Sequence, residues 1–345
     1  MKPLLECIPN FSEGRDTDTL HKLAAAIRSV PEVALLHEDV SDGANRTVMT
    51  FAGPPQAVIE AAYRALKVAA TTIDMRKQAG VHPRIGAVDV CPFVSLTGMT
   101  QDEAVSLVNG LAQRVGTGLN LPVYLYEQNS QQLHRKYLPQ IRRGEYEGLA
   151  QKMTDPRWVP DYGPETFQPR VGATVMGVRN LLVAFNLSVR GVSPEQVTEI
   201  AKRLRETGVS GNPLRPGEAV RGRLPATRVI GWYQTDYDTA QLSMNLLDYR
   251  KTTPLQAYLA AEELVQAAGG TIIGSELIGL MPEACLLEAG RYRPSGRDSV
   301  ESLVQTGIEQ LRLDRLRPFR PDAQILEYRL RAVGLLKDAE QIGLL

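Results

Sequence analysis

The sequence has no excess of charge of either sign, few cysteines and no long hydrophobic run. Its 345 residues include 39 Lys and Arg against 39 Asp and Glu, so the formal net charge is zero. This balance argues against a general surface for nucleic acids or anionic membranes. No apolar run reaches the roughly 20 residues that a membrane-spanning helix needs. Acidic residues come too early at the N-terminus for a secretory signal. We therefore expect a cytoplasmic protein with no nucleic-acid or membrane partner.

Only three cysteines are present, together with four histidines. Cys7, Cys91 and Cys285 are far apart in the sequence and lie in apolar, strand-like runs, which predicts reduced thiols in the core. A zinc site is not expected, because no two cysteines have a CxxC spacing and no two histidines are four residues apart. The glycine-rich and serine signatures of dinucleotide-binding, P-loop and α/β-hydrolase proteins are also missing. The sequence therefore predicts no bound metal.

Hydrophobic periodicity predicts the same order of elements twice. The first half has strands at about 4–9, 33–37, 47–51 and 87–96 and helices at about 20–27 and 57–73. The second half has strands at 181–189, 229–233, 241–247 and 271–280 and helices at about 194–204 and 254–267. Both halves read βαββαβ, the pattern of ferredoxin-like sandwiches. We predict an α+β protein of two such subdomains, residues 1–178 and 179–335, facing a central cleft.

Capping patterns and turns refine this outline. Thr100 with Glu103, and Ser193 with Gln196, form capping boxes at the starts of two helices. A further strand is expected at 123–126. The pentapeptides IPNFS and AFNLS, one in each half, favour a duplication, although chance similarity is the alternative.

Two segments are predicted to be irregular. Trp158 to Gly172 reads WVPDYGPETFQPRVG, which is rich in Pro, Gly and aromatic residues and has no helical or alternating period. A long irregular segment in a compact chain is usually functional or disordered, and the aromatic residues argue against disorder. We predict a covering or binding loop between the two domains, where ligand pockets are common. The basic stretch from Val209 to Leu224 is interpreted as a second loop.

His82 lies on a loop punctuated by glycine and proline, in the stretch GVHPRIG. A helix-compatible run ends just before this loop and a strand-like run begins just after it, a setting in which functional residues are often placed. Histidine can take up and release a proton near neutral pH. Arg84 adds a fixed cation, and Gly86 permits close approach of the backbone. His82 is therefore a candidate catalytic residue; the alternative is a histidine that caps a turn or binds a carbonyl.

Four other polar residues follow or open predicted strands. Asn10 and Asp39 each follow a strand, where turn formation is the ordinary role and contact with a ligand is the alternative. The carboxylate of Asp39 is also a candidate for orienting His82. Asn45 and Arg46 open a strand, and a guanidinium suits bidentate recognition of a carboxylate.

Longer motifs point to a known family. In chain order they are ECIPNFSEGRD, DVSDGANRTVMTFAGPP, GVHPRIGAVDVCPFVSL, LPVYLY, IRRGEYEGL, PDYGPETFQPRVGAT, GWY and SMNLLDY. With these motifs the chain resembles the glutamate formimidoyltransferase family from about Leu5 to Tyr328. The motifs are long and spaced along nearly the whole chain, so the resemblance is more specific than any short pattern.

The resemblance implies transfer of the formimidoyl group from N-formimidoyl-L-glutamate to N5 of tetrahydrofolate, a cosubstrate, with 5-formimidoyltetrahydrofolate and L-glutamate as products. This reaction belongs to histidine degradation and one-carbon metabolism. The family's members have two ferredoxin-like subdomains facing a folate-binding cleft and form dimers, which implies a homodimer here. In animals the domain is fused to a cyclodeaminase; the present chain has no room for one, so we expect a separate cyclodeaminase downstream.

The resemblance also implies site residues. The family's catalytic histidine falls on His82. Its folate-binding segment falls on Gly163, Pro164, Glu165, Thr166, Phe167, Gln168, Pro169, Arg170, Val171 and Gly172.

The implied reaction requires proton transfer at two nitrogens. N5 of the folate attacks the formimidoyl carbon and must then lose a proton, whereas the departing glutamate nitrogen must gain one. His82 could act as base and then as acid. Asp39 and Arg84 are candidate supporting residues; Arg84 and Arg46 are also candidates for binding the glutamate carboxylates, and Asn10 for a polar edge of the substrates.

Two alternatives remain open. One is formyl transfer between N-formylglutamate and tetrahydrofolate, or the reverse reaction from 5-formyltetrahydrofolate. The other is a folate carrier or sensor without catalysis.

Overall fold

The computed structural model describes residues 2–209, 220–234, 237–292, 299–337 and 342. The chain divides into two compact units, the first ending at Asn180 and the second covering Leu181–Arg329. The described residues from Leu330 to Lys337 group with the first unit. No helix in the described ranges is both long enough and apolar enough to cross a membrane.

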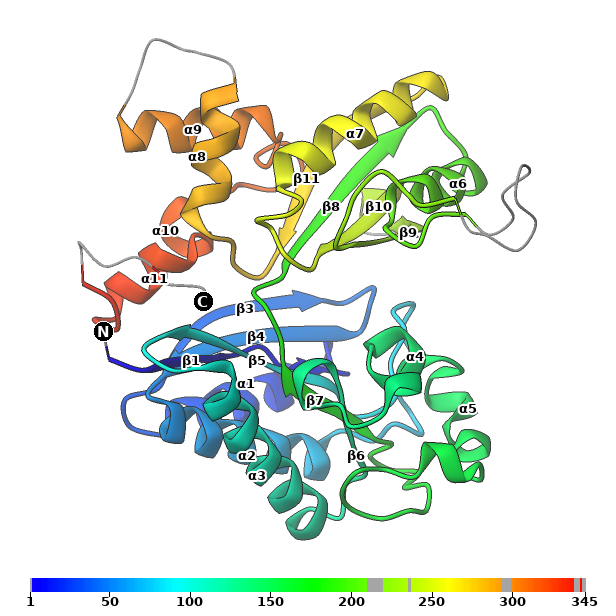
Figure 1. Cartoon of the computed structure of the whole chain (residues 1–345), viewed down its shortest axis with the longest axis vertical. Coiled ribbons are helices and arrows are strands. Elements are labelled where there is room, and N and C mark those ends of the chain that lie inside the picture. Colours follow the sequence, from blue (N-terminus) through cyan, green and yellow to red (C-terminus); the bar gives the residue numbers. More distant parts are fainter. Residues whose placement is uncertain (1, 210–219, 235–236, 293–298, 338–341, 343–345) are drawn as a thin grey trace. The chain divides into compact units, whose positions relative to one another are not determined.

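The first unit is built on a seven-stranded sheet (Figure 1). Its strands are β1 (Leu4–Cys7), β2 (Asn10–Phe11), β3 (Ala34–Ser41), β4 (Arg46–Gly53), β5 (Val88–Thr97), β6 (Val123–Leu125) and β7 (Thr174–Val178). β1 and β2 share one position, because each pairs antiparallel with both β4 and β5. β3 pairs antiparallel with β4, and β7 runs parallel to both β5 and β6. The sheet order is therefore β3, β4, β1 with β2, β5, β7, β6.

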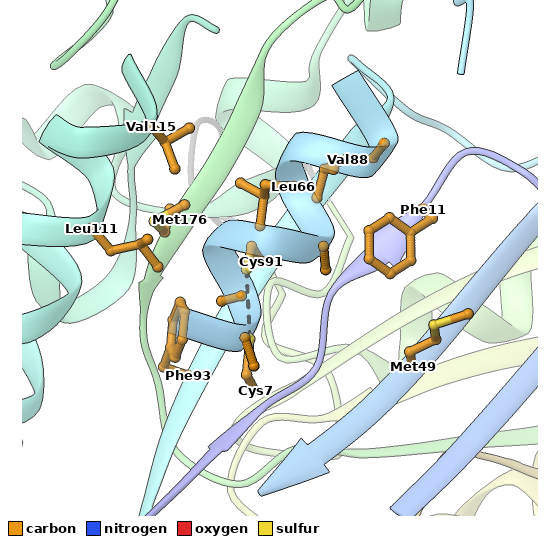
Figure 2. Packing of buried hydrophobic residues seen from close by; sticks show 14 of the residues in the cluster. Cys7, Phe11, Met49, Leu66, Val88, Cys91, Phe93, Leu111, Val115 and Met176 are labelled. Carbon is orange, nitrogen blue, oxygen red and sulfur yellow. Dashed lines mark hydrogen bonds between the residues drawn. The ribbon is translucent and has the colours of Figure 1, made fainter. Parts of the chain in front are cut away.

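Helices cover this sheet on both faces. Figure 1 shows α1 (Thr17–Arg28), α2 (Pro55–Thr72) and α3 (Gln101–Gly118) packed together below the strands. Figure 2 shows part of the core that they form, in which Leu66 of α2 and Leu111 of α3 face Met176 of β7. Because side chains alternate along a strand, Val175 points to the opposite face. It belongs to a second cluster with Ile141 and Leu149.

Those two residues come from a short helical hairpin, α4 (Leu138–Arg142) and α5 (Glu145–Lys152). The hairpin turn contains Gly144 at a φ of 88°, a conformation that glycine adopts without strain. The described residues of this unit also form three short 3₁₀ turns: η1 (Glu127–Asn129), η2 (Leu133–Arg135) and η3 (Pro156–Trp158).

The second unit contains a four-stranded antiparallel sheet. In order across the sheet its strands are β11 (Thr271–Ile278), β8 (Val183–Arg190), β10 (Thr239–Leu246) and β9 (Thr227–Gln234). Its helices are α6 (Pro194–Leu204), α7 (Pro254–Ala267), α8 (Glu283–Tyr292), α9 (Val300–Gln310) and α10 (Pro321–Gln324). α11 (Leu326–Ala332) spans the residues at which the chain leaves this unit. The apolar core lies between the sheet and these helices.

Both predicted capping boxes are confirmed. The Thr100 hydroxyl accepts from the Glu103 amide at 3.2 Å at the start of α3, and the Ser193 hydroxyl accepts from the Gln196 amide at 3.3 Å at the start of α6. The α7 helix has the predicted limits. These features are encoded within a few residues of sequence, which is why local patterns identify them.

Three sequence predictions need correction. β3 continues to Ser41, so Asp39 lies within a strand rather than after one. The strand β7 has no predicted counterpart, because its five residues follow directly on the irregular segment. Cys285 lies on α8 and not in a strand-like run.

All three cysteines are buried and free, and Cys7 Sγ lies 3.6 Å from Cys91 Sγ (Figure 2). Residues 210–219 of the predicted loop from Val209 to Leu224 lie outside the described residues.

Candidate active site

His82 lies on the loop that connects α2 to β5, half-buried beside the sheet of the first unit. The base of this loop is fixed by backbone pairing with the segment that precedes β7. Gly86 forms a bridge with Gly172, and the Ala87 amide donates to the Val171 carbonyl at 2.8 Å. A Cβ at Gly86 would lie 2.1 Å from a backbone oxygen, so this close approach requires glycine. The loop is therefore held by long-range pairing.

Next to His82, one buried carboxylate lies between two guanidinium groups. Asp89, on β5, is fully buried. Its Oδ2 accepts from Arg46 Nη1 at 2.8 Å and from Arg142 Nη2 at 2.6 Å. Its Oδ1 accepts from Arg142 Nε at 3.3 Å and from the Ile85 amide at 3.1 Å. The carboxylate thus joins β4, α4, β5 and the histidine loop.

The charges in this cluster determine its protonation. Burial by itself would raise the pKa of Asp89, but the charges of Arg142 and Arg46 hold that pKa below its usual value, so the carboxylate is ionised. Burial lowers the pKa of Arg46 to about 10, despite the opposing effect of Asp89. Both guanidinium groups are cationic at neutral pH. Two cations and one anion leave a net positive charge beside the histidine.

The imidazole of His82 makes its hydrogen-bond contacts through Nδ1. This atom lies 2.9 Å from the Pro83 carbonyl oxygen and 3.1 Å from Arg46 Nη1. Burial lowers the pKa of His82 well below its ordinary value, and the charges of Arg46 and Arg142 lower it further, with Asp89 and the Pro83 carbonyl opposing them. The ring is therefore neutral at pH 7. An Nδ1–H that donates to Pro83 leaves a lone pair on Nε2.

The α4–α5 hairpin is attached to the histidine loop by several contacts. Arg84 Nη1 and Nη2 donate to Glu147 at 2.8 and 2.7 Å, and Glu145 lies 3.5 Å away. The Tyr146 amide donates to the Arg84 carbonyl at 2.8 Å. Within the hairpin, Lys152 Nζ of α5 donates to the Ile141 carbonyl of α4 at 2.6 Å, next to Arg142. The predicted supporting residue Arg84 therefore has its guanidinium occupied by carboxylates of α5, and it acts as a tether for the loop.

The three predicted substrate-binding residues are close together. Arg46 Nη2 donates to Asn10 Oδ1, and Asn10 Nδ2 donates to the Ile8 carbonyl at 2.9 Å. Asn45 accepts from the Gly14 amide at 2.9 Å and donates to the Ala79 carbonyl at 3.1 Å. Asn45 thus holds three loops around the site, whereas Arg46 and Asn10 belong to the charged cluster itself.

Asp39 has a different neighbour from the predicted one. Its Oδ2 lies 3.7 Å from Nε2 of His37, on the same strand. The carboxylate that acts on His82 is Asp89, through Arg46. The reason is the strand register: Asp39 pairs with Val48 in the interior of β3, whereas Arg46 opens β4 at the end next to the loop.

The segment Gly163–Gly172 adjoins the same loop. The Tyr146 hydroxyl donates to the Pro169 carbonyl at 2.5 Å, and its ring lies 5.5 Å from that of Phe167. Arg170 Nη2 donates to the Thr71 carbonyl at 2.5 Å at the end of α2. One end of the segment pairs with the base of the histidine loop, and its aromatic residue packs on the α5 hairpin.

Two residues of the cluster, Asp89 and Arg142, are missing from the sequence-predicted set. The sequence does contain a signal for Asp89, because it is the one charged residue in the apolar run Ala87–Phe93. A carboxylate buried in such a strand needs a charged or hydrogen-bonding partner. Arg142 has no comparable signal, since its role depends on the placement of α4. Within the described ranges, no group of three His, Cys, Asp or Glu side chains is arranged to hold a metal ion.

Comparisons with known proteins match both units of the chain. Residues 4–179 match the family described as "Formiminotransferase domain, N-terminal subdomain", and residues 184–331 match "Formiminotransferase domain". A rat protein named formimidoyltransferase-cyclodeaminase is 41% identical over 332 residues, which are 95% of this chain and 60% of the rat protein. The chain thus spans about 60% of the length of that relative.

Shorter relatives match along most of their own length. The glutamate formimidoyltransferase of Streptococcus pyogenes serotype M1 is 35% identical over 292 residues, 85% of this chain and 93% of that protein. The Thermoplasma acidophilum protein of the same name is 35% identical over 291 residues, 84% of this chain and 91% of that protein.

Proposed function

Because the chain belongs to the formiminotransferase family, we propose that it is a glutamate formimidoyltransferase. It transfers the formimidoyl group from N-formimidoyl-L-glutamate to N5 of tetrahydrofolate and releases L-glutamate. The names of the streptococcal and archaeal relatives support this donor. The proposal concerns the transferase activity alone, since the chain spans only part of the rat relative.

The observation that supports this chemistry best is the state of His82. In the neutral imidazole the Nδ1–H donates to the Pro83 carbonyl, which leaves the lone pair on Nε2 and makes that atom basic, while Arg46 lies beside the ring as a cation. A general base must be unprotonated at the working pH and must reach the proton that it removes. His82 meets the first condition because burial and two neighbouring guanidinium groups disfavour the imidazolium.

In the proposed mechanism, His82 moves one proton between two nitrogens. The N5 lone pair forms a bond to the formimidoyl carbon, and the C=N π pair moves to the formimidoyl nitrogen. Nε2 then takes the N5 proton. The imidazolium gives this proton to the glutamate nitrogen as that C–N bond breaks and the C=N bond re-forms. Arg46 repels the imidazolium, which favours release of the proton. Such transfer typically contributes about 10²–10⁴-fold to the rate.

Other features of the site suit the two substrates. The net positive charge of the Arg46, Asp89 and Arg142 cluster favours an anionic ligand such as glutamate. The segment Gly163–Gly172 is proposed to bind tetrahydrofolate, which is supported by its position against the histidine loop.

The strand orders support ferredoxin-like topology in both units. In the first, β1 with β2 lies between β4 and β5, and in the second, β8 lies between β10 and β11. In each βαββαβ set the first strand is thus flanked by the third and fourth, and the second strand is at the edge. Membership of the family also leads us to propose a cytoplasmic homodimer.

The test is an assay of purified protein with N-formimidoyl-L-glutamate and tetrahydrofolate, following glutamate and 5-formimidoyltetrahydrofolate. N-Formylglutamate is compared as donor by kcat/KM. Transfer of the formimidoyl group that is lost in His82→Ala supports the proposal. A preference for N-formylglutamate would identify a formyltransferase, and binding of tetrahydrofolate without turnover of either donor would identify a carrier or sensor.

A further inference from the structure

Asp89 connects the charged side chains of the described residues that act on the pKa of His82. Those groups are Arg46 from β4, Arg142 from α4 and Asp89 itself from β5. Arg46 Nη1 is shared between Asp89 Oδ2, at 2.8 Å, and His82 Nδ1, at 3.1 Å. The same carboxylate accepts from the amide of Ile85, three residues after the histidine. One acidic side chain thus fixes both the backbone of the loop and the cation that contacts its imidazole.

Arg142 completes this arrangement from a separate part of the chain. It binds Asp89 through both Nε and Nη2, so its planar guanidinium is held in one orientation. The hairpin that carries it is in turn fixed to the histidine loop by Arg84 and Glu147. Because Arg142 binds both oxygens of the Asp89 carboxylate, it fixes the orientation in which Oδ2 accepts from Arg46.

We propose that Asp89 and Arg142 are positioning residues of the transfer reaction, which hold the Arg46 cation beside the imidazole of His82 and fix the loop that carries it, while the Pro83 carbonyl keeps the proton on Nδ1 and leaves Nε2 as the basic atom. This inference rests on the proposed function. Neither residue is required to touch a substrate, because both act through Arg46.

The arrangement has a charge consequence with a definite sign. Loss of the Arg142 cation removes a group that disfavours the imidazolium, so the pKa of His82 rises. Loss of the Asp89 anion leaves two cations beside the ring, so that pKa falls. One charge a few ångströms away, in a medium of intermediate dielectric, shifts a pKa by about 0.5–1 unit or more. A purely structural role would not give opposite shifts for two partners of the same ion pair.

The experiment uses full-length Arg142→Gln, Arg142→Lys and Asp89→Asn. The titration of His82 is followed by NMR of the imidazole nitrogens, with the signal identified by its absence in His82→Gln, alongside the pH profile of kcat/KM. Arg114→Gln is the matched control. Arg114 of α3 and Arg64 of α2 both bind the Glu60 carboxylate, in the same way that Arg142 and Arg46 both bind Asp89. Circular dichroism and thermal unfolding monitor folding.

We expect Arg142→Gln to raise the pKa of His82 and move the acidic limb of the profile upward by about 0.5–1 pH unit. Arg142→Lys, which keeps the charge, restores the wild-type titration. Asp89→Asn lowers the pKa and reduces kcat/KM at least about tenfold, as expected for lost positioning. Arg114→Gln changes neither the pKa of His82 nor kcat/KM.

Equal titrations in Arg142→Gln and wild type, or identical effects of Arg142→Gln and Arg142→Lys, would overturn the inference. If Asp89→Asn fails to fold, the two Arg142 variants decide alone. Because the NMR titration needs no turnover, expected pKa shifts in a protein that transfers no formimidoyl group would refute the proposed function and leave the positioning of His82 supported.

Discussion

Asp89 and Glu60 are both carboxylates bridged by two arginines, yet they have different surroundings. Glu60 lies on α2, with 33% of its side chain exposed, and accepts from Arg64 at 2.8 Å and Arg114 at 2.7 Å. Asp89 has the same kind of partners but an exposed fraction of 0%. Water screens the Glu60 cluster, whereas the charges around Asp89 act on each other and on His82 in a medium of lower dielectric. The same pattern of ion pairs is therefore a screened surface contact at Glu60, whereas at Asp89 it controls the charge around His82.

The largest expected difference between the two regions is in activity. His82→Ala removes the group proposed to transfer the proton, and we expect formimidoyl transfer to fall about 10²–10⁴-fold. Glu60→Ala lies outside the site and retains wild-type turnover. Steady-state kinetics with both substrates at saturation makes the measurement. Retention of most of the turnover in His82→Ala would remove the acid–base assignment.

Stability separates the two carboxylates next. Asp89→Ala leaves two largely buried guanidinium groups without their anion, and we expect a loss of about 3–5 kcal/mol in the free energy of unfolding. Glu60→Ala costs about 1 kcal/mol or less, because its pairs are screened. Urea unfolding at pH 7.5 measures both. Similar losses for the two variants would show that burial does not distinguish them.

The pH dependence of stability should report His82. Its pKa in the folded state lies below the ordinary value of 6.5, so the unfolded chain binds more protons at this position as pH falls below 6.5. The wild-type protein therefore loses unfolding free energy in this window, by up to about 1.4 kcal/mol per pH unit. His82→Gln lacks this contribution and has a flatter dependence between pH 7.5 and 5. Parallel curves for the two proteins would contradict the lowered pKa.

The smallest effect concerns the exposed cluster itself. A double-mutant cycle on Glu60 and Arg114 should give a coupling energy of about 1 kcal/mol or less, which decreases as salt is raised from 0.05 to about 1 M. Arg114 also contacts the Tyr63 ring, with its guanidinium carbon 3.6 Å from the ring centre. The substitution of Arg114 removes this contact whether or not Glu60 is present, so the contact cancels from the coupling energy. A coupling energy that is insensitive to salt would indicate that this surface pair is less hydrated than its exposure implies.

Local sequence patterns predicted most of the elements but few of the contacts in the site. The capping boxes at Thr100 and Ser193 depend on side chains three residues apart, so they can be read directly. β7 was not predicted, because its five residues follow directly on the irregular segment and its neighbours in the sheet, β5 and β6, are far from it in sequence. The exact end of β3 depended on its pairing with β4, which placed Asp39 inside the strand.

The candidate site shows the same division. His82 could be singled out because glycine, proline and flanking regular elements mark its loop, and because the surrounding motif resembles a known family. The family, the order of elements in both halves and the assignment of His82 as a candidate were thus contained in the sequence by itself. Its role in catalysis stays a prediction that the assays above test.

Only the tertiary structure decided which groups surround that histidine. Arg46 and Asp89 are 43 residues apart, and Arg142 is 53 residues from Asp89. No local periodicity encodes such distances, because the side chains meet only once the strands have paired and α4 has packed against the sheet. The lowered pKa of His82 likewise arises from burial and from these assembled charges. The sequence determined which residue types were available; their protonation and orientation were decided by folding, which removed them from water and placed them within hydrogen-bonding distance.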